Sequence, residues 1–151
     1  MKGRVRWIED VMFLAESGSG HAMVLDGAPE SGGRNIGMRP MELMLLGVGS
    51  CSSFDVVTIL RKARQQVTAC DAELTAQRVD TTPAVFKSIH LHFKVAGHNL
   101  SEKQVARAIE LSADKYCSAS IMLKAAGVKV THDFEIVATP AAAPASEADP
   151  G

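Results

Sequence analysis

Residues 40–64 read PMELMLLGVGSCSSFDVVTILRKAR, and this stretch decides the fold more than any other part of the chain. Proline suits the first turn of a helix, and Glu42 stands near the start, where the helix dipole favours an acidic side chain. Arg61, Lys62 and Arg64 stand at the other end, where the dipole favours bases. Apolar residues occupy almost every side between these ends, which predicts a helix buried on most of its surface.

The apolar surface of this helix must be buried against other parts of the protein. In a chain of 151 residues, the cover is expected from sheets that wrap the helix or from a second subunit. The uncharged run from Leu43 to Phe54 is shorter than the roughly 20 residues that cross a bilayer, so no membrane span is predicted.

Composition and charge exclude several classes of protein. Sixteen Lys and Arg residues stand against 17 Asp and Glu residues, and the net charge of −1 argues against a nucleic-acid-binding domain. The N-terminus, MKGRVRWIED, lacks the apolar segment of a secretory signal. Three cysteines are too few for a disulfide scaffold, so we expect a cytoplasmic protein.

The elements on either side of the helix follow from hydrophobic periodicity and turn residues. Strands are predicted at residues 4–8, 11–15, 22–25, 72–77, 88–95 and 128–136, and two further helices at about 101–116 and 120–126. A glycine-rich loop, 26–38, precedes the long helix and is expected to be functional or mobile. The order β-β-β-α-β-β-α-α-β predicts an α+β fold.

The two ends of the chain differ in composition. Residues 1–138 carry all the predicted elements and are expected to form one domain. Residues 139–151 are rich in Ala and Pro and show no periodicity, which predicts a disordered, dispensable tail.

Two cysteines are the main candidates for chemistry. Cys51 lies in the middle of the long helix, and Cys117 lies at the junction of the later helices, just before the helix-start residues Ser118 and Ser120. Both positions also suit buried packing cysteines, and that interpretation stays open. Asp55, one turn beyond Cys51 on the same helix face, favours a reactive site, because a charge in an apolar helix needs a partner. Sequence spacing does not show whether the two thiols meet.

Other residues that could do chemistry are interpreted as structural. Cys70 precedes a strand and is expected to be a packing residue. His90 and His92 share the outward face of strand 88–95 and could bind a metal ion, but with no cysteine or acid in register they are interpreted as solvated polar residues. No metal site and no cofactor are predicted.

Two segments resemble a known family. The segment from Pro40 through Glu42 to Cys51, and the segment Lys115-Tyr-Cys117-Ser-Ala-Ser-Ile-Met-Leu, resemble the OsmC/Ohr superfamily and its YhfA-like branch, over roughly residues 3–137. The resemblance implies an intertwined homodimer in which antiparallel sheets wrap long central helices. It also implies a thiol-dependent hydroperoxide reductase of the oxidative or osmotic stress response, reset by a dithiol reductant. Cys51 would then be the peroxidatic thiol and Cys117 the resolving thiol.

The chain departs from the family pattern beside the first cysteine. The hydroperoxide-reducing members carry a Glu ten residues before that cysteine, and this chain has Met41 there. Glu42 stands one step later, about 180° around the helix from Cys51. The activating Arg of the family has no clear counterpart, and Arg39 and Arg34 are its candidate substitutes.

Two functions therefore remain in competition. In the first, Cys51 and Cys117 reduce an organic hydroperoxide, assisted by Glu42 and Arg39. In the second, the chain is a non-catalytic dimer that binds a small apolar or electrophilic molecule, or a thiol redox sensor. A membrane or nucleic-acid partner is expected in neither case.

Overall fold

The computed structural model describes residues 1–138, so the predicted tail, 139–151, lies outside the described residues. The chain divides into two compact units, Met1–Gly47 and Val48–Gly151. Helix α1 (Pro40–Lys62) runs through the boundary between them.

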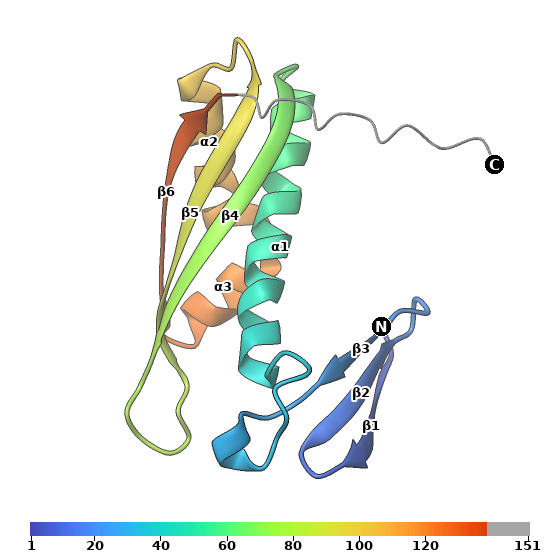
Figure 1. Ribbon diagram of the computed structural model, residues 1–151. Coiled ribbons are helices and arrows are strands. Elements are labelled where there is room, and N and C mark those ends of the chain that lie inside the picture. The colour runs from blue at the N-terminus through green and yellow to red at the C-terminus, as the bar shows by residue number, and fades with distance from the viewer. Residues whose placement is uncertain (139–151) are drawn as a thin grey trace, which may run out of the picture. The chain divides into compact units, whose positions relative to one another are not determined.

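The first unit contains a three-stranded antiparallel sheet in the order β1-β2-β3, drawn in blue in Figure 1. Its strands are β1 (Gly3–Glu9), β2 (Met12–Ser17) and β3 (Ala22–Leu25), which confirms the three strands predicted there. The turn between β1 and β2 contains Asp10 at φ 45°, a conformation that Asp tolerates better than most residues.

The loop that follows β3 is ordered around one carboxylate. Asp26 is only 3% exposed, and it accepts backbone N–H bonds from Gly27 at 2.7 Å, Arg34 at 2.9 Å and Ile36 at 3.2 Å. The predicted loop is present, and it contains a short 3₁₀ helix, η1 (Pro29–Ser31), that the sequence analysis did not anticipate. Backbone N–H groups withdrawn from water need acceptors, and Asp26 supplies acceptors for three of them while carbonyls of the loop accept others.

Helix α1 begins at Pro40, as predicted, and its first-turn acid caps it. Glu42 accepts the backbone N–H of Arg39 at 2.8 Å, which satisfies one of the free donors at the helix start. The residues buried along its length are Val48, Gly49, Ser52, Val56 and Leu60, a stripe close to i, i+4 spacing. The prediction that the helix is covered on most sides is therefore wrong for the single chain.

The exposed part of α1 is strongly apolar. Phe54 is 73% exposed, and Met44 and Leu46 are about half exposed. With 23 residues, α1 meets by length and composition the criterion for a membrane span, which the sequence-based estimate from a shorter run did not foresee. Core helices of soluble proteins meet the same criterion, so this is weak evidence for a membrane.

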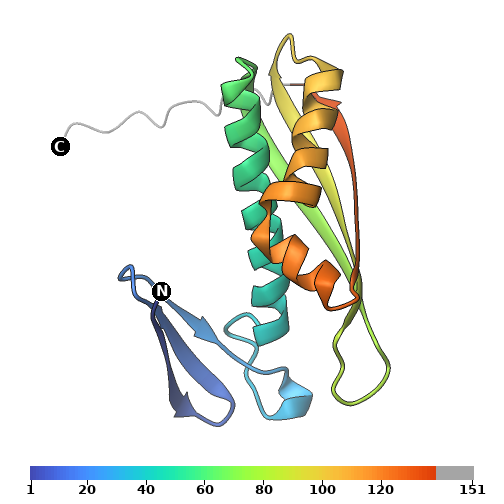
Figure 2. The same cartoon turned by 180° about the vertical axis from the view of Figure 1, so that it is seen from behind.

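The second unit is a three-stranded sheet with helices on one face (Figures 1 and 2). Its strands are β4 (Gln66–Arg78), β5 (Phe86–His98) and β6 (Lys129–Val137). Between β5 and β6 lie α2 (Glu102–Leu111), the π-helical turn η2 (Ser112–Tyr116) and α3 (Ser118–Ala125). Strands β4 and β5 are antiparallel, but β5 and β6 are parallel, which corrects the expectation of purely antiparallel sheets. The helices between β5 and β6 return the chain to the end where β5 began, as a parallel pair requires.

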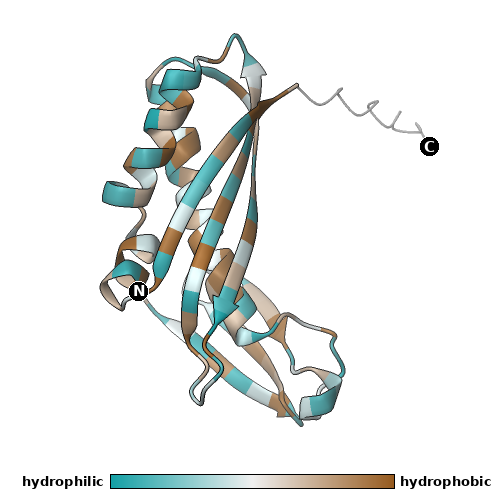
Figure 3. Ribbon diagram, turned by 90° about the vertical axis from the view of Figure 1, so that its left-hand side faces the viewer, coloured by the Kyte–Doolittle hydropathy of each residue, from teal (hydrophilic) through white to brown (hydrophobic). Residues whose placement is uncertain are grey.

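The core of the second unit lies between this sheet and its helices. Strand β5 alternates as predicted, with Ile89, Leu91, Phe93 and Val95 nearly inaccessible to solvent. Figure 3 shows the same alternation of hydrophobic and hydrophilic residues along the strands. Helix α2 contributes Val105, Ala108 and Ile109 at i, i+3, i+4 spacing. The core fixes the helices on which the candidate site is built.

The three N–H bonds to Asp26 predict a pH-dependent loop. Burial opposes ionisation, but the backbone donors Ile36, Arg34 and Gly27 hold the pKa of Asp26 below its usual value. Its stabilising effect is therefore present above the ordinary carboxyl pKa and is lost as the pH falls through the lowered one. Asp26→Asn should lower the melting temperature at neutral pH by several degrees.

This prediction is checked by circular dichroism melting at neutral and acidic pH. The difference between wild type and Asp26→Asn should shrink in acid. Glu30→Gln, an exposed acid in the same loop, is the matched control and should melt like the wild type. Equal melting temperatures for all three chains at neutral pH would contradict the proposed role of Asp26.

Candidate functional site: a buried thiol pair

Cys117 is held in place by the turn that precedes it and the helix that follows. Its backbone N–H donates to the carbonyl of Ser112 at 2.9 Å, and its sulfur caps α3 by accepting the N–H of Ser120 at 3.4 Å. The side chain is 0% exposed. The helix start predicted from Ser118 and Ser120 is confirmed, and it places a thiol where the N-terminal end of a helix stabilises negative charge.

The structure brings together three of the residues singled out in the sequence. The sulfur atoms of Cys51 and Cys117 and a carboxylate oxygen of Asp55 all lie within 4.8 Å of one another. Cys51 and Asp55 come from one face of α1, as i, i+4 spacing predicts, and Cys117 comes from the N-cap of α3. Cys51 is half-buried, so of the two thiols it is the one that a small molecule can reach.

The serines beside the thiols were not predicted as site residues. The Ser52 hydroxyl donates to the Cys117 sulfur at 3.1 Å and lies 3.4 Å from the Ser120 hydroxyl. Ser112 donates its hydroxyl to the carbonyl of Ser52 at 3.2 Å. All three serines are buried. Ser52 is one of several small polar residues in this stretch of the helix, and spacing alone did not distinguish it from Ser50 or Ser53.

These contacts shift the pKa values of the two thiols in opposite directions. Burial works against a Cys117 thiolate, but the hydroxyls of Ser120 and Ser52, the Ser120 N–H and the Cys51 thiol together lower the pKa of Cys117. Burial raises the pKa of Cys51, and the neighbouring Cys117 and Asp55 raise it further against one N–H bond from Ala119. A peroxidatic cysteine needs a lowered pKa, so within the single chain Cys51 lacks the cation that this role requires.

Asp55 is the least satisfied group of the site. Burial raises its pKa, with a partly offsetting hydrogen bond from the Ser112 side chain. Its Oδ2 atom is buried and has no hydrogen-bond partner among the described residues, 1–138. An unsatisfied buried acceptor lowers the free energy of unfolding by about 1–3 kcal/mol, so Asp55 destabilises the folded chain.

The other predicted site residues lie in the first unit. The Arg39 guanidinium pairs with Glu42 at 3.0 Å, and Arg34 pairs with Glu9 at 2.7 Å. The structure therefore joins Arg39 to Glu42, but it does not place either residue relative to the thiols of the second unit. Cys70, on β4, is half-buried, and burial followed by the charge of Asp71 raises its pKa to about 11.

Comparisons with known proteins agree with this arrangement. The profile of the OsmC-like protein family matches residues 32–133, which include both cysteines of the pair. The chain is 47% identical over 138 residues to Protein YhfA of Escherichia coli strain K12, covering 91% of this chain and 99% of that protein. The chain belongs to the OsmC-like protein family.

Solved structures of other proteins share the fold. A hypothetical protein from Aquifex aeolicus VF5 is 28% identical with a TM-score of 0.75, covering 90% of this chain and 96% of that one. The organic hydroperoxide resistance protein OhrB of Bacillus subtilis is 14% identical with a TM-score of 0.60, covering 89% and 96%. At 14% identity the second likeness establishes the fold alone.

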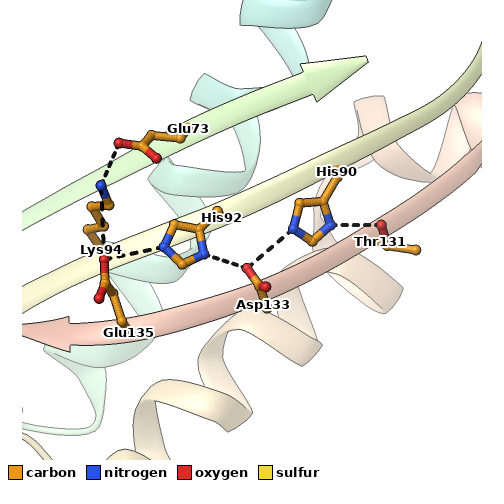
Figure 4. Close-up of polar contacts among 7 residues, drawn as sticks. All are labelled: Glu73, His90, His92, Lys94, Thr131, Asp133 and Glu135. Atoms are coloured by element: carbon orange, nitrogen blue, oxygen red, sulfur yellow. Dashed lines mark hydrogen bonds and ion pairs between the residues drawn. The ribbon is translucent and has the colours of Figure 1, made fainter. Parts of the chain in front are cut away.

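This OsmC-like chain also carries a polar cluster on the outer face of its second sheet (Figure 4). His92 contacts Asp133 at 2.5 Å and Glu135 at 3.3 Å, and His90 contacts Asp133 at 3.3 Å. Thr131, Lys94 and Glu73 extend the cluster, the last two through an ion pair of 2.6 Å. The statement that no acid lies in register with the histidines is wrong, because the parallel pairing places Asp133 opposite His92.

The cluster predicts a measurable titration. Hydrogen bonds to Asp133 and then to Glu135 raise the pKa of His92 above its ordinary value. The stabilisation is therefore complete below the ordinary histidine pKa of about 6.5 and is lost as the pH rises through the raised value. In NMR titrations of the ring protons, Asp133→Asn should bring the pKa of His92 down toward the ordinary value.

Thr131→Val supplies the matched control for this titration. Thr131 lies on the same strand and contacts His90 Nδ1 at 2.9 Å, with no contact to His92 among the described residues. The variant should leave the His92 titration unchanged. An identical His92 pKa in Asp133→Asn and the wild type would show that the ion pair does not form in solution.

Proposed function

We propose that this protein reduces organic hydroperoxides, with Cys51 as the peroxidatic thiol and Cys117 as the resolving thiol. The observation that carries the proposal is the approach of the two sulfur atoms to within 4.8 Å. The thiols come from different helices, and a sulfenic acid on one is close to the thiol of the other. OsmC-like relatives named for hydroperoxide resistance support the same assignment.

The proposed reaction balances in three steps. The Cys51 thiolate attacks the O–O bond of ROOH, giving Cys51–SOH and, after protonation of the leaving oxygen, ROH. The Cys117 thiolate then attacks the sulfenic sulfur, forming the Cys51–Cys117 disulfide and releasing water. A dithiol reductant exchanges with the disulfide, becomes oxidised itself and returns both cysteines to thiols.

The environment of Cys117 suits the second step. A resolving cysteine must be a thiolate when it attacks the sulfenic acid, and the hydroxyls of Ser52 and Ser120 lower its pKa. The same donors make Cys117 a good leaving group when the disulfide is reduced. Its burial keeps peroxide away from it and leaves Cys51 as the reachable nucleophile.

The first step needs a cation near Cys51 to reverse its raised pKa. Arg39 is our candidate, oriented by its ion pair with Glu42 and supplied by either subunit of a homodimer. A guanidinium beside the sulfur would stabilise the thiolate and offset the charge of Asp55. Arg39 and Glu42 thereby take the roles that the family assigns to its activating Arg and Glu.

Exposed apolar side chains support a homodimer. Trp7 is 64% exposed on β1, together with Val5 and Ile8, and Phe54 is exposed on α1. Large apolar side chains left exposed in each unit are candidates for burial at an interface between subunits. A second copy of the chain would cover the helix face that one chain leaves open.

The alternative function keeps the fold without the catalysis. The raised pKa of Cys51, together with Met41 at the position of the family glutamate, favours a dimer that binds a small apolar or electrophilic molecule or senses redox state. In that case a disulfide could form slowly, without rapid consumption of peroxide.

A peroxide assay with peptide mapping distinguishes the two functions. Stoichiometric organic hydroperoxide should give a Cys51–Cys117 disulfide within the dead time of manual mixing and leave Cys70 reduced. Cys51→Ser should abolish consumption, and Cys117→Ser should trap Cys51 as sulfenic acid or a more oxidised form. Arg39→Ala should slow the reaction of Cys51 about tenfold or more. If Arg39 lowers the pKa of Cys51 by one unit, about 1.36 kcal/mol, its removal cuts the fraction of reactive thiolate about tenfold.

Cys70→Ser is the control for the assay, because it removes a thiol outside the pair, and it should consume peroxide at the wild-type rate. If both thiols stay reduced under excess peroxide, and Cys51 is alkylated no faster than a free thiol, the peroxidase proposal fails. The protein would then be a binding module on this fold.

The dimer is tested through Trp7, the one tryptophan in the sequence. Light scattering should give twice the chain mass of 16.1 kDa, and Trp7 emission should be blue-shifted as for a buried indole. Dilution below the dissociation constant should shift the emission to the red. A folded particle of 16.1 kDa at micromolar concentration would contradict the dimer.

A further inference from the structure

We propose that Cys51, Cys117 and Asp55 form a binding site for a thiophilic divalent cation such as Zn²⁺, with two sulfur ligands and one oxygen ligand. No metal site was expected at these residues from the sequence, because the approach of Cys117 to Cys51 and Asp55 is a tertiary feature. The proposal requires only reduced thiols, so it stands or falls independently of the peroxidase proposal.

The geometry is close to what zinc requires. Two sulfur ligands, each about 2.3 Å from a tetrahedral zinc ion, lie about 3.8 Å apart, and a carboxylate oxygen binds at about 2.0–2.2 Å. The three candidate atoms already lie within 4.8 Å of one another. Cys51 and Asp55 are only half-buried, and the proposal requires that their side chains move closer to Cys117 when the metal binds.

The charges of the site favour a cation. Two thiols and a carboxylate, all of which lose a proton when they bind a metal ion, gather here within 4.8 Å of one another. The Oδ2 atom of Asp55 is buried without a hydrogen-bond partner in the described part of the chain. A bound cation would accept this oxygen as a ligand and displace the thiol protons. The two thiolates and the carboxylate, which would otherwise repel one another, would each be attracted to the cation.

The hydrogen bonds around the three ligands resemble a supporting shell for a metal site. The Cys117 sulfur accepts from the Ser52 hydroxyl at 3.1 Å and from the Ser120 N–H at 3.4 Å, contacts that a metal-bound thiolate can keep. The Ser112 hydroxyl donates to the carbonyl of Ser52 at 3.2 Å, which ties the turn before Cys117 to the helix that carries Asp55. Donors of this kind orient metal ligands and stabilise their charged forms.

The ligand set determines which class of metal binds and leaves one coordination position open. Two thiolates favour Zn²⁺ over Mg²⁺ or Ca²⁺, which prefer oxygen ligands. Three protein ligands leave the fourth tetrahedral position for water or another small ligand. Because the metal would occupy both sulfur atoms, metal binding and the Cys51–Cys117 disulfide exclude each other.

Anaerobic titration of the reduced, full-length protein with Co²⁺, followed by displacement with Zn²⁺, tests the site. We expect one Co²⁺ per chain, with thiolate-to-cobalt charge-transfer bands that disappear as Zn²⁺ replaces it. Cys51→Ser and Cys117→Ser should each remove most of this absorption. Asp55→Asn, which keeps both thiols and the side-chain shape, should weaken binding about tenfold or more, a change of about 1.4 kcal/mol.

Two matched controls separate the site from general thiol binding. Cys70→Ser and Asp71→Asn alter a thiol and an exposed acid on β4, and both should bind Co²⁺ like the wild type. Should a cysteine variant fail to fold, as judged by its metal-free melting curve, the affinity of Asp55→Asn decides. Absence of saturable binding, charge-transfer bands that survive both serine substitutions, or unchanged affinity in Asp55→Asn would each overturn the proposal.

Discussion

The buried sulfur of Cys117 is the point on which the second unit is organised. It caps α3 through the Ser120 N–H and accepts the hydroxyl of Ser52 on α1, so one atom joins two helices that lie far apart in the sequence. The π-helical turn before it presents the Ser112 carbonyl to its N–H and the Ser112 hydroxyl to α1. Because polar groups buried this deeply must find partners, the network fixes the position of α3 against α1, and with it the distance between the two thiols.

The same network gives the two cysteines different electrostatic environments. The donors gather on Cys117, whereas Cys51 faces burial and the carboxylate of Asp55. The thiol with the lowered pKa therefore occupies the inaccessible position, and the accessible thiol of Cys51 is left in need of a positive charge. A partner subunit's arginine and a thiophilic cation are two ways to meet that need, and both follow from the same electrostatic imbalance.

Local sequence signals predicted the elements well, because each signal depends on near neighbours. The alternation from Ile89 to Val95 and the helix starts at Pro40 and Ser118 appear in the structure as expected. The errors involve pairing between distant segments. The parallel register of β5 and β6, which places Asp133 opposite His92, leaves no trace in the spacing of either strand.

The sequence by itself determined the α+β order, the helix that carries Cys51 and Asp55 on one face, and the family to which the chain is similar. Only the tertiary structure decided that Cys117 meets that face, that Ser52 and Ser112 support it, and that Asp55 keeps an oxygen without a partner. The physical reason is that periodicity encodes which face of an element is buried, whereas the partner of that face is chosen by packing over the whole fold.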